Sequence, residues 1–225
     1  MNDADPANRT SIASEGLPAV LRAATRNAHH VIDHHPLLAP LVLPGLQLEH
    51  YRRVLRTFLW IHAPLQETFA RAIEQVGGRY DLADRVSWLR ADLVQLGAGV
   101  ALSEHAWQPP LLRDAAELVG VLYVVEGSTL GGQVIARRVE ASLGLGPAHG
   151  ATFFNGWGTQ TEARWSDFWR FAASICPPTG YQAAAIAAVN FFDLLKHSLD
   201  QAQSGERECF PENTELGGEP RHQVL

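Results

Sequence analysis

Several residue types are scarce in this chain of 225 residues, and each shortage excludes a class of protein. Cys176 and Cys209 are the only cysteines, and they lack the spacing of metal ligands, so we expect free thiols in a reducing compartment. Lys196 is the single lysine among 18 basic residues, so any anion site must be built from arginine. The formal net charge is −6, and we therefore expect no nucleic-acid partner.

Long apolar runs and alternating patterns are missing as well. The sequence has no stretch of about 18 consecutive apolar residues, and its polar N-terminus lacks the apolar segment of a signal peptide. We therefore expect a cytoplasmic protein with no membrane span. No segment alternates between apolar and polar residues for long enough to form a strand, so we expect no sheet.

Helical periodicity fills most of the chain. We predict a single all-α domain over residues 17–203, between flexible polar tails at 1–16 and 204–225. Its six main helices are predicted at 17–35, 46–76, 82–96, 111–143, 159–175 and 179–201. The glycine-rich loop 146–158 carries Phe153, Phe154 and Trp157, which are exposed unless they pack on the helices.

Three glycines, Gly127, Gly131 and Gly132, lie inside the fourth of these helices. Each costs about 1 kcal/mol relative to alanine, or about 3 kcal/mol together. Gly127 and Gly131 are four residues apart and share one helix face, which offers bare backbone to a flat object or allows a kink. Small residues at this spacing are equally typical of close helix–helix packing. The segment alone does not distinguish the two interpretations.

A polar stripe on the first helix consists of Arg22, Arg26, His29 and Asp33. His29 and Asp33 are four residues apart, so the carboxylate can hold the second ring N–H of a metal-bound imidazole. The two arginines can pair with ligand carboxylates. The stripe can equally be an ordinary solvated face. Taken with the glycines, it suggests a planar metallated macrocycle with carboxylate arms held between two helices.

The other histidines give weaker signals. His30, His34 and His35 can form a surface metal cluster, whereas His62 lies on an apolar helix face and is expected to be a core residue. No Glu-x-x-His pairs are placed on two facing helices, as a di-iron site would require. Neither a serine nucleophile elbow nor a phosphate-binding loop is present.

Three segments in order resemble the haem oxygenase family, and more closely its biliverdin-producing bacterial branch, often found beside bacteriophytochromes. Residues 21–29 (LRAATRNAH) resemble the segment that leads to the haem-ligating histidine. Residues 122–132 (LYVVEGSTLGG) resemble the bacterial distal helix. Residues 153–158 (FFNGWG), followed by Arg164, Trp165 and Phe168, resemble a later segment of that branch.

The resemblance implies haem held between a proximal helix and a kinked distal helix. It implies that His29 is the iron ligand and that Asp33 forms a hydrogen bond with His29. It also implies contacts to haem, on its propionate side or its distal face, from Arg22, Arg26, Arg170, Tyr123, Gly127, Gly131 and Gly132.

The implied activity is the opening of the haem ring to biliverdin, with release of carbon monoxide and ferrous iron. Haem is then both cofactor and substrate, and O2 is the second substrate. Because the chain has no flavin or nicotinamide motif, electrons must come from an external donor, a reductase or a ferredoxin. The resemblance also suggests a bacteriophytochrome as the protein that receives biliverdin.

One position departs from the best-studied animal members of the family. They carry an aspartate after the first distal glycine, and this chain has Ser128 there, whose hydroxyl is not an acid. Glu126 is close in sequence, but its side chain points about 100° away from Gly127 on the helix. The serine keeps open a second class, a haem-binding or carrier protein that does not open the ring. A third class, a thiamin-salvage hydrolase or a di-iron oxygenase of similar fold, lacks its required residues here.

Overall fold

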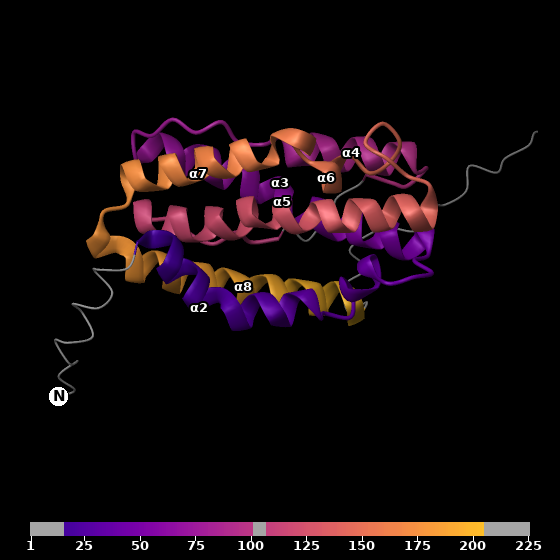
Figure 1. The fold of residues 1–225 in the computed structure, drawn as a ribbon, viewed down its shortest axis with the longest axis horizontal. Coiled ribbons are helices and arrows are strands. Elements are labelled where there is room, and N and C mark those ends of the chain that lie inside the picture. Colours follow the sequence, from indigo (N-terminus) through magenta and orange to yellow (C-terminus); the bar gives the residue numbers. More distant parts are fainter. Residues whose placement is uncertain (1–15, 101–106, 205–225) are drawn as a thin grey trace, which may run out of the picture.

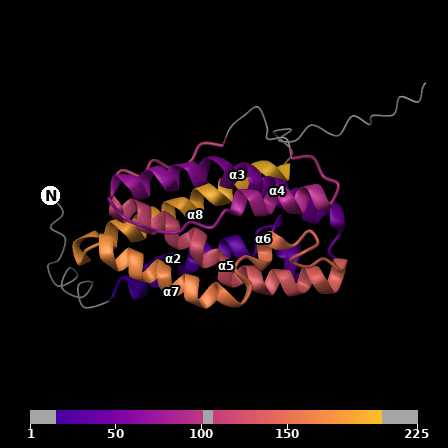
Figure 2. The same ribbon diagram turned by 90° about the horizontal axis from the view of Figure 1, so that it is seen from above.

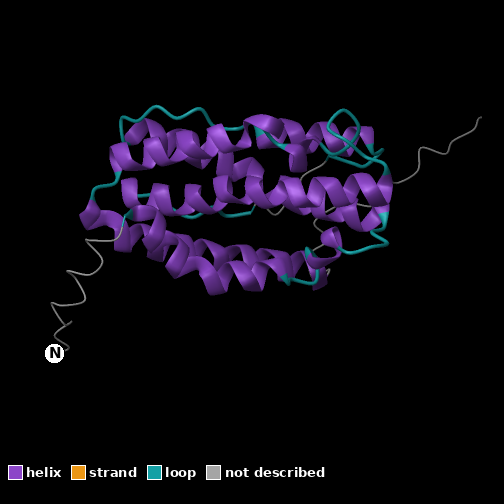
Figure 3. Ribbon diagram, in the orientation of Figure 1, coloured by secondary structure: helices purple, strands orange, loops and turns teal. Residues whose placement is uncertain are grey.

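The computed structural model describes residues 16–100 and 107–204, and within these residues it contains helices and loops but no β-strand (Figure 3). The all-α prediction is therefore confirmed. The predicted tails, 1–16 and 204–225, lie outside the described residues except for one residue of each.

Seven α-helices are described, and six of them correspond to the six predicted ones. They are α2 (Leu17–Asp33), α3 (Leu48–Gln75), α4 (Arg85–Gln95), α5 (Ala115–Leu143), α6 (Thr152–Asn155), α7 (Thr161–Ile175) and α8 (Tyr181–Ser204). Short 3-10 turns occur at Ala39–Val42, Gly158–Gln160 and Pro178–Gly180.

The ends of α5 follow from local chemistry. At its start, the side chain of Asp114 accepts a hydrogen bond of 2.9 Å from the backbone N–H of Glu117, which satisfies one free donor of the first turn. At its end, Gly144 adopts a φ of 69°, a left-handed conformation that favours glycine. Between these points α5 is continuous for 29 residues, so the three internal glycines do not interrupt the helix.

Figures 1 and 2 show how the helices are arranged. In Figure 1, α5 crosses the middle of the molecule, with α7 above it and α2 and α8 below it. Helix α5 packs against α8, α7 and α6, while α2 packs against α8, and α3 against α4. Helix α8 is thus a shared support for α2 and α5.

Helix α6 was not predicted, because it depends on a residue distant in sequence. The buried carboxylate of Asp92 in α4 accepts bonds of 2.8 Å from the backbone N–H groups of both Thr152 and Phe153. Phe154 is buried in the core, and the ring of Trp157 packs edge-on against Trp88. The aromatic residues of the predicted loop are therefore packed.

Helix α5 also has the length and apolarity of a membrane span, which we did not expect from the sequence. However, half of its most apolar window is buried inside the fold. The core helix of a soluble protein has the same properties, and the structure is consistent with a soluble protein.

Candidate functional site

His29 lies on the outer side of α2 with its imidazole held in place at one nitrogen. Its Nδ1 lies 2.8 Å from a carboxylate oxygen of Asp33, one helical turn later, as the spacing predicted. Because the carboxylate can only accept, this contact assigns the proton to Nδ1 and leaves a lone pair on Nε2 for a metal. The His29 side chain is 62% exposed, so a ligand can reach it. Its ring edge packs against Phe192 of α8 at 5.9 Å between centroids.

The glycines of α5 have different surroundings. A Cβ added at Gly131 would meet nothing within 4 Å, and a Cβ at Gly127 would lie 3.5 Å from the ring of Trp165. At Gly132 it would lie 3.0 Å from the carbonyl oxygen of Phe154. Gly131 therefore borders open space, whereas Gly132, expected to contact haem, lies on the packed side of α5 and is left out of the proposed site.

The exposed side of α5 around Gly131 is apolar. Leu130 and Val134 are 39% and 45% exposed. They lie on either side of Gly131 along the helix, and Ser128 of the preceding turn is also exposed. Exposed aliphatic side chains beside bare backbone form a surface suited to a flat apolar ligand.

His29 and the glycine turn lie at the same level of the bundle. Helices α5 and α8 meet where Gly120 approaches Ala184 and Ala187, and both run in the same direction from there. Each helix rises about 1.5 Å per residue, so Gly127 and Phe192 both lie roughly 10 Å beyond this crossing. Because Phe192 contacts His29, the exposed imidazole and the glycine turn are reached at the same height along α8.

The remaining predicted site residues divide into two groups. Arg22 and Arg26 are exposed on α2 together with His29, and Arg22 Nε donates to the carbonyl of Pro18 at 3.1 Å. Tyr123 packs against α7, and Arg170 lies on α7 itself.

The ring of Tyr123 packs against Trp165 and Trp169 at about 6 Å between centroids. The exposed guanidinium of Arg170 pairs with Asp167 beside a surface depression that also includes Tyr80. These contacts join Tyr123 and Arg170 to residues of α7 and not to His29.

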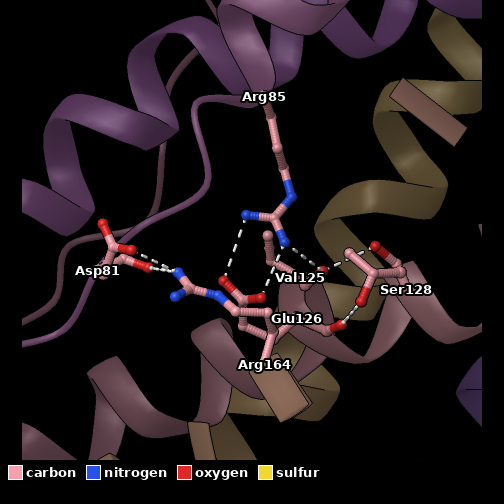
Figure 4. Close-up of polar contacts among 7 residues, drawn as sticks. Asp81, Arg85, Val125, Glu126, Ser128 and Arg164 are labelled. Atoms are coloured by element: carbon pink, nitrogen blue, oxygen red, sulfur yellow. Dashed lines mark hydrogen bonds and ion pairs between the residues drawn. The ribbon is translucent and has the colours of Figure 1, made fainter. Parts of the chain in front are cut away.

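Glu126 points into the packed side of α5, as its position on the helix predicted. Its carboxylate forms two bonds, of 3.2 and 3.0 Å, with the guanidinium of Arg85 at the start of α4 (Figure 4). Both side chains are about 5% exposed or less. Glu126 therefore balances a buried positive charge and does not face the open side.

These residues fit haem as a ligand. In the described part of the chain, no three His, Cys, Asp or Glu side chains gather as a metal site. Iron in a porphyrin has four ring nitrogens and needs a single protein ligand on the proximal side, which the Nε2 atom of His29 can supply. A Cβ at Gly131 would occupy space that is open in this structure, so the backbone of α5 is accessible there.

Comparison with known proteins decides the family. A family model described as "Heme oxygenase" matches residues 15–196, most of the chain. This chain belongs to the haem oxygenase family. A curated haem oxygenase from Xanthomonas campestris pv. campestris (strain 8004) is 36% identical over 110 residues, which are 48% of this chain and 64% of that relative. The matched segment thus spans less than two thirds of the relative's length.

Solved haem oxygenases share the fold. The NO- and CO-bound haem oxygenase of Neisseria meningitidis superimposes with a TM-score of 0.66 at 21% identity, covering 84% of this chain and 92% of that one. The haem oxygenase of Leptospira interrogans gives a TM-score of 0.65 at 16% identity, covering 83% and 100%. At these identities the likeness establishes the fold alone.

Sequence reasoning missed three residues of this region: Gly120, Arg85 and Phe192. Gly120 and Phe192 are apolar residues in apolar helices, and nothing local identifies them as contacts between helices. Arg85 had an indirect signal, because Glu126 follows the apolar run 118–125 and a carboxylate in such a helix requires a partner.

Proposed function

We propose that this protein is an active haem oxygenase that opens haem to biliverdin and releases carbon monoxide and ferrous iron. One observation carries the proposal: a ligand-ready imidazole at His29 lies at the level of an open glycine face in a chain of this family. When bound, haem supplies the redox chemistry with O2 and is itself the substrate.

The residues near this face receive separate tasks. His29 holds the iron through Nε2, and Asp33 fixes the ring and its tautomer. Gly127 and Gly131 let the ligand approach the backbone of α5, and Ser128 faces the same side. Because Gly127 and Gly131 have no side chains, they would leave room for the edge of the ring beside α5 when haem is bound.

The ring's carboxylates need cationic partners. Arg22 and Arg26 are exposed on the same helix as the proposed ligand and can pair with propionates without displacing a buried partner. Arg170 and Tyr123 are proposed to close the propionate side from α5 and α7. For Arg170 this requires exchange of its present partner, Asp167.

Other proteins complete the reaction. The electrons come from an external reductase or ferredoxin, and the biliverdin is delivered to a bacteriophytochrome in a cytoplasmic setting. These assignments rest on the resemblance of segments 21–29, 122–132 and 153–158 to the bacterial branch.

The decisive experiment adds hemin and then a reductant in air. Wild-type protein should show a Soret band and then the absorbance of biliverdin, and His29→Ala should lose or alter both. His30→Ala is the matched control, because His30 is the next residue on the same exposed helix. A Soret band without biliverdin would identify a haem carrier, and an unchanged His29→Ala variant would remove His29 from the site.

A further inference from the structure

Arg85 forms a buried ion pair with Glu126, which lies two residues before Ser128 in α5 (Figure 4). Taking two charges out of water is costly, and a buried pair often adds no more stability than well-packed apolar residues. The bidentate contact, with N–O distances of 3.2 and 3.0 Å, nevertheless fixes the positions of Arg85 and Glu126 relative to each other. This suggests a task other than holding the fold together.

The same arginine reaches the carbonyl group that receives the Ser128 hydroxyl. Arg85 Nη2 lies 3.5 Å from the carbonyl oxygen of Val125, and Ser128 Oγ donates to that oxygen at 2.7 Å. A hydroxyl group has one hydrogen and two lone pairs. Because the hydrogen is directed into the helix, exposed Ser128 presents its lone pairs to the open side.

The turn needs support because glycine restrains the backbone least. Gly127 separates Glu126 from Ser128. Arg85 contacts the chain just before Gly127 at two points, the carboxylate of Glu126 and the backbone carbonyl of Val125. Such a contact behind a functional group keeps its rotamer fixed.

We propose that Arg85 and Glu126 are a positioning pair that holds Ser128 as a fixed hydrogen-bond acceptor for a water on the open side of α5. Ser128 does not supply a proton. It accepts one hydrogen of this water and leaves the other directed into the site. The inference rests on the proposed function, because the water matters only where haem is bound.

Two titratable side chains near the pair, Tyr80 and His62, have shifted pKa values. Burial and the negative charge of Glu126 raise the pKa of Tyr80. Burial and the positive charge of Arg85 lower the pKa of His62 to about 3. Asp81 is paired with Arg164 at 2.9 Å. Tyr80 and His62 therefore both stay neutral in a pH titration of the haem complex between pH 6 and 10.

The proposal requires the water that donates to Ser128 to be the one bound to iron in the ferric haem complex. The test measures the pKa of that water from the absorbance of the complex. A neutral acceptor stabilises water, which donates, more than hydroxide, so Ser128→Ala should lower this pKa by about half a unit to one unit. Arg85→Met/Glu126→Leu should also lower the pKa of this water, because the Ser128 hydroxyl is then free to rotate. Adding Ser128→Ala to that double variant should produce no further change beyond the serine variant alone.

Thr129→Ala is the matched control. Thr129 Oγ1 donates to the carbonyl of Glu126 at 2.5 Å, so it has the same kind of bond, whereas Arg85 reaches the carbonyl of Val125 instead. This variant should keep the wild-type pKa. If the double variant fails to fold, Arg85→Lys takes its place, because lysine keeps the charge but cannot form the bidentate contact. This variant should also lower the pKa of the iron-bound water.

The outcomes separate the two proposals. Biliverdin formation with equal pKa values in wild type and Ser128→Ala would overturn the acceptor role and leave the proposed function intact. A low pKa in Ser128→Ala with a wild-type value in the Arg85 variants would reduce the ion pair to a structural element. Wild-type protein that binds no hemin would overturn the proposed function and this inference together.

Discussion

The two halves of α5 use the same helix in opposite ways. From Ala116 to Glu126 nearly every side chain is buried, and Gly120 lies so close to α8 that a Cβ would come within 2.1 Å of the Ala184 carbonyl oxygen. From Gly127 onward, exposed positions dominate one side, and Gly131 borders open space. Glycine thus allows close helix packing at Gly120 and leaves the backbone accessible at Gly131. The neighbouring segments determine which of the two occurs.

The largest effect should come from breaking the buried pair of the packed half. Arg85→Met leaves Glu126 without its partner in the core and should lower the free energy of unfolding by about 3–5 kcal/mol. Urea denaturation of the haem-free protein measures the loss. Arg85→Met/Glu126→Leu is the control, since it leaves no lone charge and should be close to wild type. An equal loss in both variants would contradict this account.

The packed glycine should tolerate no side chain. Gly120→Ala places a methyl group against backbone of α8 that cannot rotate away, and it should cost about 3 kcal/mol of unfolding free energy. The same denaturation experiment applies. A variant as stable as wild type would show that α5 and α8 can separate at no cost.

Acid should weaken the packed side through His62. Burial and the nearby charge of Arg85 lower the pKa of His62 from 6.5 to about 3. Below pH 6.5 the unfolded chain therefore binds a proton that the folded protein does not, so stability falls as the pH drops from about 6.5 to 3. Between pH 7 and pH 5 the loss should be about 2 kcal/mol, and His62→Gln should remove it. An unchanged pH dependence in this variant would mean that His62 titrates normally.

The smallest effect, of opposite sign, should come from the open half. Gly131→Ala adds a methyl group where nothing lies within 4 Å and replaces a poor helix former, so the haem-free protein should gain about 1 kcal/mol. The same variant should bind hemin more weakly, as a spectroscopic titration would show. A loss of stability would place Gly131 in a packed environment and remove the contrast with Gly120.

Much of the fold could be predicted because helical periodicity is local information. Each predicted helix ends within four residues of its predicted boundary, and the differences at the N-termini reflect capping, as at Asp84 before α4. Helix α6 could not be predicted, because it begins where Asp92, about 60 residues earlier in the chain, receives its first two N–H groups.

The site divides in the same manner. The His29–Asp33 contact follows from a four-residue spacing within one helix and is confirmed. The functions of Gly120, Gly131 and Gly132 depend on which segment lies opposite, and sequence spacing contains no such information. For the same reason, the sequence could not predict that Arg85 contacts the Val125 carbonyl, which accepts the Ser128 hydroxyl.

The exposed apolar side of α5 has a consequence for handling the protein. Leu130 and Val134, together with Val31 on α2, leave aliphatic surface in contact with water in the absence of a ligand. Such surface favours self-association, and a bound ring that covers it would remove the tendency. The solubility of this protein should therefore follow the supply of haem, and a cell short of haem would hold less of the protein in soluble form.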